Sequence, residues 1–181
     1  MMRLILFSAF ILWTSLASAQ KFMTEEGKAV FLSEAPLSSF EGESDYLAGL
    51  IDLEQNLLDF YLDLNTLETG IGLRDRHMRE NYLETEEFPF AEFTGKLDDV
   101  PSLEMNQQMP VKAIGKFKIH GVEREIEVNG FLTWVSEDEI NLEASFEVLL
   151  SDYEIPLPKL VFYELAENQK VTLTANLKKT Q

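Results

Sequence analysis

The sequence contains no cysteine and only two histidines, His77 and His120. Without cysteine the chain can form no disulfide, and it has neither a thiol nucleophile nor a thiolate metal ligand. One histidine beside scattered carboxylates also falls short of the three or four convergent ligands of a zinc site. No motif of the common hydrolases, nucleotide-binding enzymes or metalloproteases is present. The sequence therefore predicts a protein that is not an enzyme, with no catalytic residue, metal site or cofactor.

Basic residues are scarce as well. The 15 Lys and Arg residues stand against 32 Asp and Glu, which gives a formal net charge of −17 at pH 7. A field of this sign repels nucleic acids and anionic bilayer surfaces. It favours solubility, and any preference it confers is for neutral or cationic ligands and partners. We therefore expect no nucleic-acid partner.

Long apolar runs are absent after residue 19. Met1–Ala19 itself combines a basic residue, Arg3, with an apolar stretch at Leu4–Trp13 and a small-residue cleavage site at Ala17–Ala19. This order is typical of a secretory signal peptide, and the stretch is too short to span a bilayer. We expect a periplasmic or secreted protein without a transmembrane anchor. The remaining residues, 20–181, are predicted to form one domain.

Alternation of apolar and polar residues is the dominant pattern in this domain, and it is typical of half-buried strands. The clearest runs are 57–64, 90–97, 111–119, 122–134, 139–150 and 171–178. A shorter apolar stretch at 29–32 and a weaker alternation at 45–53 bring the total to about eight strands. This is about the number at which a closed antiparallel barrel can hold one small ligand.

One hairpin is specified in detail. If His120-Gly121 is a two-residue turn, Lys118 lies opposite Glu123 and Lys116 lies opposite Glu125. The outer face then carries cross-strand ion pairs, and the inner face is apolar. We interpret His120 as a turn residue.

A single short helix interrupts the strands. Leu73–Glu84 is rich in strong helix formers, follows the glycines of Thr69–Gly72 and ends before Phe88-Pro89. The pattern thus predicts an all-β, antiparallel barrel of about eight strands, with one helix at about 73–84 that covers an end or a flank.

The residues around this helix carry a resemblance to a known family. The matching residues are Arg74, Asp75, His77, Met78, Asn81-Tyr82-Leu83, Phe88-Pro89 and Phe93-Thr94. They resemble the signature of the YceI-like family. The resemblance implies an exported, lipocalin-like barrel that holds an isoprenoid or fatty-acid-like molecule. The chain departs from the family at Tyr82-Leu83, where many members have paired phenylalanines.

The inward faces of the predicted strands mix large aromatic residues with Ala and Gly. Two interpretations follow: a filled core in which large and small side chains alternate, or an elongated apolar cavity. Periodicity alone favours the filled core, and the resemblance favours the cavity. The residues predicted to line such a cavity are Phe60, Phe93, Ala113, Phe117, Trp134, Ala144, Phe146 and Leu173.

Two functions are consistent with these patterns. In the first, the exported barrel binds a long-chain apolar molecule for carriage or sequestration. In the second, a filled barrel acts through its acidic surface on another protein and binds no small molecule. The sequence leaves open the identity of the ligand and whether the protein forms a homodimer.

Overall fold

The computed structural model describes residues 20–36, 38–102, 104–157 and 165–180. Within these ranges, eight strands form one closed barrel in chain order, each antiparallel to the next, with β8 pairing back onto β1. The strands are β1 (Lys21–Ala35), β2 (Ser38–Asp52), β3 (Leu57–Asp63), β4 (Phe90–Leu97), β5 (Gln108–Ile119), β6 (Val122–Ser136), β7 (Glu139–Leu149) and β8 (Asn168–Lys179). The predicted fold is thereby confirmed. The predicted signal peptide lies outside the described residues.

The first two strands are longer than the sequence indicated. β1 has 15 residues, whereas only 29–32 showed a clear apolar signal. Its pairing with β2 shifts register on both sides of Gly27, between Thr24 and Gly27 and again between Gly27 and Ala29. Each irregularity breaks the period-2 pattern along the strand, so alternation alone cannot reveal it. The barrel thus begins well before the stretch that the sequence marked.

The β5–β6 hairpin has the predicted register, with Lys118 opposite Glu123 and Lys116 opposite Glu125. The ion pairs, however, run to other partners. Lys116 Nζ lies 2.7 Å from Oε1 of Glu123, which is diagonal to it across the hairpin. Lys118 Nζ lies 3.0 Å from Oε2 of Glu92 on β4. The hydrogen bond from Lys116 to Glu123 raises the pKa of this lysine. The charges therefore join three strands on the outer face of the barrel.

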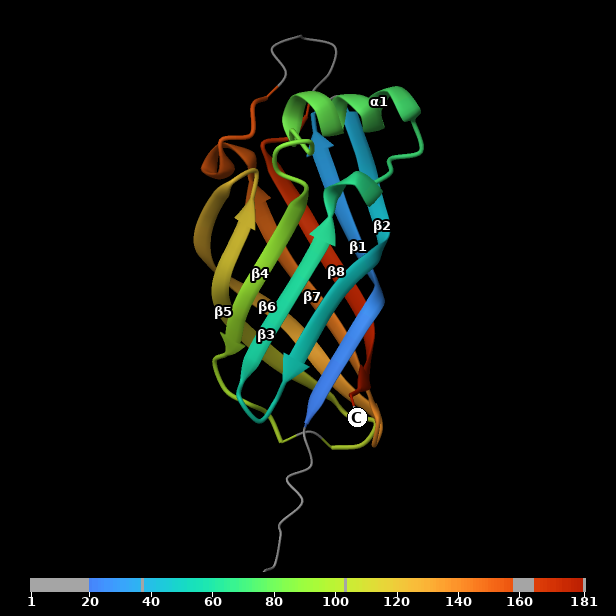
Figure 1. Cartoon of the computed structure of the whole chain (residues 1–181), viewed down its shortest axis with the longest axis vertical. Coiled ribbons are helices and arrows are strands. Elements are labelled where there is room, and N and C mark those ends of the chain that lie inside the picture. Colours follow the sequence, from blue (N-terminus) through green and yellow to red (C-terminus); the bar gives the residue numbers. More distant parts are fainter. Residues whose placement is uncertain (1–19, 37, 103, 158–164, 181) are drawn as a thin grey trace, which may run out of the picture.

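The predicted helix is present, as α1 (Gly72–His77) followed directly by a π-helical turn, η2 (Met78–Tyr82). Figure 1 shows this helix across the upper end of the barrel, which is one of the two positions predicted for it. Buried Asp75 fixes its start, because it accepts hydrogen bonds from the backbone N–H and the hydroxyl of Thr69. Short 3-10 helices follow β3 and β7, η1 (Leu64–Thr66) and η3 (Leu150–Tyr153). No helix in the described part of the chain has the length and apolar character needed to cross a membrane.

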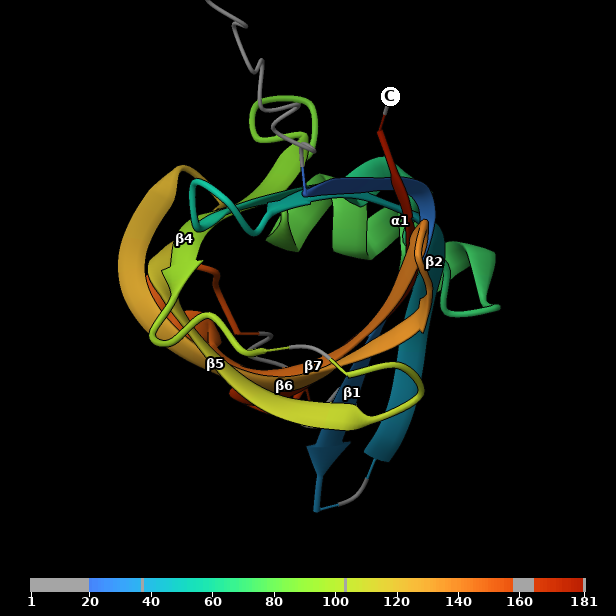
Figure 2. The ribbon, with the colours of Figure 1, turned by 90° about the horizontal axis from the view of Figure 1, so that it is seen from below.

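The lower end of the barrel is filled with apolar side chains. Phe22, Ile51, Leu132, Ile140 and Leu177 are each at most 2% exposed. The connection between β4 and β5 runs across this end (Figure 2). Its backbone is hydrogen-bonded to the barrel, because the Asn106 N–H donates to the carbonyl oxygen of Trp134 on β6 over 2.8 Å. This end is therefore closed, and any opening must lie at the helix end.

Candidate ligand-binding cavity

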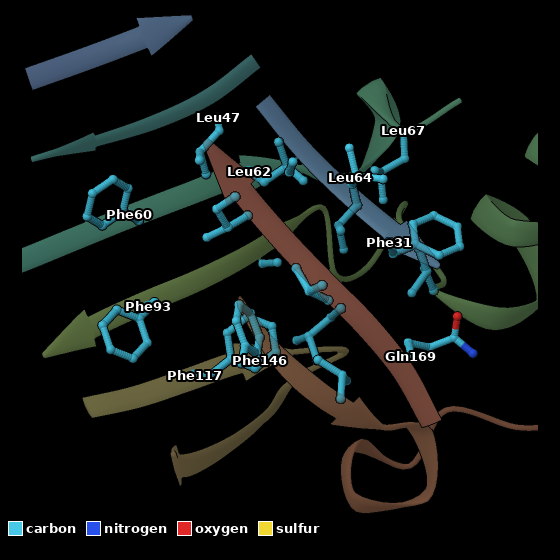
Figure 3. Close-up of a pocket in the computed structure, with 18 of the residues that line it drawn as sticks. Phe31, Leu47, Phe60, Leu62, Leu64, Leu67, Phe93, Phe117, Phe146 and Gln169 are labelled. Atoms are coloured by element: carbon cyan, nitrogen blue, oxygen red, sulfur yellow. The ribbon is translucent and has the colours of Figure 1, made fainter. Parts of the chain in front are cut away.

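A cavity of about 810 Å³ occupies the barrel above this filled layer. All eight strands contribute to its lining, which is mostly apolar, and Figure 3 shows part of it. Ile51 and Leu132 belong both to the lining and to the filled layer, so they form its floor. The hypothesis of a filled barrel is contradicted by this cavity.

Most of the residues predicted to line a cavity do so. These are Phe60, Phe93, Ala113, Phe117, Ala144, Phe146 and Leu173. Trp134 is not in the lining. It pairs with Ile140, which pairs in turn with Leu177, and neither of these fully buried residues reaches the cavity. Trp134 therefore lies at the closed end, beyond the floor, although it occupies an inward position of the alternation.

The cavity stays open because large rings lie flat against the wall over glycines. Phe60 pairs with Gly49, and a Cβ placed on Gly49 would lie 1.9 Å from the Phe60 ring. Phe93 covers the cross-strand pair of Gly95 and Gly115 in the same way, with its Cζ 2.8 Å from a Cβ built on either glycine. The rings fill the space that side chains would occupy there. They consequently leave the centre of the barrel empty.

The helix end of the cavity reaches the surface. Ile71 and Leu73 line the cavity and are each 50% exposed. Arg74 and His77 of α1 also line it, and the Arg74 guanidinium lies 4.3 Å from the centre of the Phe40 ring. We call this rim of Phe40, Ile71, Leu73, Arg74 and His77 the mouth. An apolar molecule entering here would pass exposed apolar side chains before reaching the interior.

The residues that cap the cavity were not among the predicted lining residues. Met78, Tyr82 and Leu83 line it from the helix segment, and Gln169 lines it from β8. The signal for Gln169 was present, because the inward alternation of the last strand extends back from Val171 to this residue. A polar residue at an inward position is unusual enough to mark a site.

His120 lies in the β5–β6 turn, as predicted, with a left-handed φ of +52°. It is also buried. Its Nε2 lies 2.9 Å from the Glu84 carboxylate, its Nδ1 lies 3.1 Å from the carbonyl oxygen of Tyr153, and its ring packs against Phe88. One side chain thus joins the hairpin, the segment after the helix and η3. Burial raises the pKa of the neighbouring Tyr153 phenol.

We expect the His120→Asn variant to have a free energy of unfolding about 1–3 kcal/mol lower than the wild type, because both hydrogen bonds are lost. Asparagine tolerates the left-handed backbone, so the substitution adds no backbone strain to the measured difference in stability. Urea denaturation measures the difference. His77→Asn is the matched control, because the His77 side chain is exposed and makes no hydrogen bond or ion pair among the described residues. Equal stability of the two variants would contradict the bridging role.

Comparison with known proteins agrees with the fold. A family model described as the YceI-like domain matches residues 19–178. The chain belongs to the YceI-like family. The residues around the helix that resemble the family signature lie within the matched range, and Tyr82 and Leu83 among them line the cavity. A comparison with curated proteins finds no match.

Solved structures similar to this YceI-like chain share its fold. A polyisoprenoid binding domain from Saccharophagus degradans, implicated in plant cell wall breakdown, is 20% identical with a TM-score of 0.79, covering 90% of this chain and 99% of that one. Burkholderia cenocepacia BcnA is 12% identical with a TM-score of 0.65, covering 85% and 96%. The Campylobacter jejuni YceI protein is 15% identical with a TM-score of 0.65, covering 82% and 90%.

Proposed function

We propose that this YceI-like protein binds one long-chain apolar molecule, an isoprenoid or a fatty-acid-like chain, inside its barrel. The observation that carries the proposal is the apolar cavity of about 810 Å³ that opens at the mouth. The similarity to a structure described as a polyisoprenoid binding domain supports an isoprenoid as cargo. The proposed contacts are the seven predicted lining residues together with the helix residues Met78, Tyr82 and Leu83.

The proposed mechanism is burial rather than chemistry. Moving a methylene group out of water contributes about 0.8 kcal/mol before the costs of association. A chain of about twenty carbons contributes about 16 kcal/mol on this scale, so it could bind with a Kd of about 1 μM and few polar contacts after association costs of about 8 kcal/mol. No group of three or more His, Asp or Glu side chains in the described part of the chain could hold a metal ion. The role that follows is carriage or sequestration.

Export belongs to the same proposal. It is supported by the pattern of Met1–Ala19, which is typical of a cleaved signal peptide. A carrier outside the cytoplasm could shield an apolar chain from water between membranes or beyond the cell. The intact mass of protein isolated from the exported fraction tests this step, because cleavage after Ala19 leaves Gln20 as the first residue. A mass that includes Met1–Ala19 would contradict it.

Binding can be measured with delipidated protein and the fluorescent apolar probe N-phenyl-1-naphthylamine. We expect saturable uptake of the probe at one molecule per chain and its displacement by geranylgeraniol, a C20 isoprenoid alcohol, at micromolar concentration or below. Displacement by a long-chain molecule identifies the interior as the shared site. No displacement, or uptake that never saturates, would contradict the proposal.

A further inference from the structure

One polar side chain in the apolar lining has an unmet hydrogen-bonding group. Gln169, the second residue of β8, is 5% exposed and lines the cavity. Figure 3 shows it at the edge of the group of side chains drawn around the cavity. Its Oε1 is buried and has no hydrogen-bond partner among the described residues. Buried polar atoms almost always have a partner, so this one requires an explanation.

The orientation of the Gln169 amide is fixed by its neighbours. Its Nε2 donates a hydrogen bond to the carbonyl oxygen of Ala166 and another, over 3.3 Å, to the Ser33 hydroxyl. The Ala166 carbonyl can only accept, so the nitrogen must face it and the amide cannot be reversed. The Ser33 hydroxyl oxygen also accepts from the Ala166 N–H over 3.1 Å. Oε1 therefore remains as an acceptor that the protein does not use.

The position of Gln169 indicates which end of a ligand it would meet. It pairs with Ser33 near the end of β1, at the helix end of the barrel, whereas the floor is formed by Ile51 and Leu132. A chain that lies along the cavity with its apolar tail on the floor would place its head near Gln169. The oxygen can bond only to a donor, and burying an anionic head beside it would be costly.

We propose that Gln169 accepts a hydrogen bond from the head of the cargo, so that the site takes long-chain molecules with a neutral hydrogen-bond-donating head, such as a primary alcohol. This inference rests on the proposed function and adds a preference for the head group. The net charge of −17 acts in the same direction, because it disfavours the approach of anionic ligands. An acid could instead place its carboxylate near Arg74 at the mouth, and the experiment separates these cases.

The test compares three ligands that share one C20 chain: geranylgeraniol, its methyl ether, which lacks the donor, and geranylgeranoate, the carboxylate. Displacement of N-phenyl-1-naphthylamine gives each affinity. Gln169→Met keeps the length of the side chain and removes the acceptor. We expect this change to weaken geranylgeraniol binding on the order of 10-fold and to leave the methyl ether almost unaffected. The wild type should bind the alcohol more tightly than the carboxylate.

The control variant is Ser33→Ala, which removes one partner of the Gln169 nitrogen but keeps the free oxygen. It should retain tight binding of geranylgeraniol. Equal weakening of the alcohol and the ether by Gln169→Met would assign the residue a purely structural role and overturn the inference, as would tighter wild-type binding of the carboxylate. Either result leaves the proposed function standing. Failure of all three ligands to bind the wild type would overturn the proposed function and this inference with it.

Discussion

Replacing Ala144 with tryptophan should abolish tight lipid binding in a protein that still folds. Ala144 lies on β7, lines the cavity and pairs with Gly130 on one side and Leu173 on the other. The indole would occupy space that the cargo uses, and the empty interior can accept it without moving the strands. If three or four methylenes lose their place at about 0.8 kcal/mol each, affinity falls on the order of 100-fold.

The matched control is the next residue along the strand. Ser145 is exposed on the outer face, so Ser145→Trp adds the same side chain outside the barrel. We expect this control to bind geranylgeraniol as the wild type does, with both variants showing native circular dichroism spectra. Wild-type affinity in a folded Ala144→Trp protein would show that the cargo lies elsewhere.

A methyl group on Gly95 should destabilise the barrel. Gly95 of β4 pairs directly with Gly115 of β5, and a Cβ at Gly95 would lie 2.6 Å from the carbonyl oxygen of Ile114 and 2.9 Å from the Gly115 Cα. Both atoms belong to the backbone, so the strands must separate. Overpacking of this kind costs about 1–3 kcal/mol, and we expect Gly95→Ala to lower Tm in a thermal melt by several degrees.

Gly72→Ala provides the comparison. A Cβ on Gly72 would meet no atom within 4 Å, and the residue begins α1. Alanine is the better helix former, so this change should leave Tm unchanged or raise it slightly. If Gly95→Ala melted at the same temperature as Gly72→Ala, the close approach of β4 and β5 would not be a constraint on the fold.

The elements that could be predicted are those whose local pattern is unbroken. β4 matches its predicted bounds at Phe90–Leu97, because its alternation is strict and Phe88-Pro89 precedes it. The β5–β6 register follows from the turn at His120-Gly121. β1 was mostly missed because its register shifts twice near Gly27. The helix was predicted from its helix-forming residues and from the glycines and proline that flank it, but its π-helical second half has no simple sequence signal.

The cavity could be predicted only in part, because alternation gives the face of a residue and not its depth. Seven predicted residues reach the interior space, whereas Trp134 has the inward face but lies below the floor. Whether the interior is filled depends on how rings such as Phe93 lie over Gly95 and Gly115. That orientation follows from pairing between distant strands, so the period of one strand does not contain it.

Native mass spectrometry of the protein isolated from the exported fraction, without delipidation, tests the central proposal most directly. We expect the mass of a chain that begins at Gln20 together with one bound molecule. Organic extraction should release this molecule as a long-chain isoprenoid or acyl species with a neutral head. The bound species should be absent from Ala144→Trp prepared in the same way. A clean apo mass, together with no uptake when lipids are offered, would contradict the account.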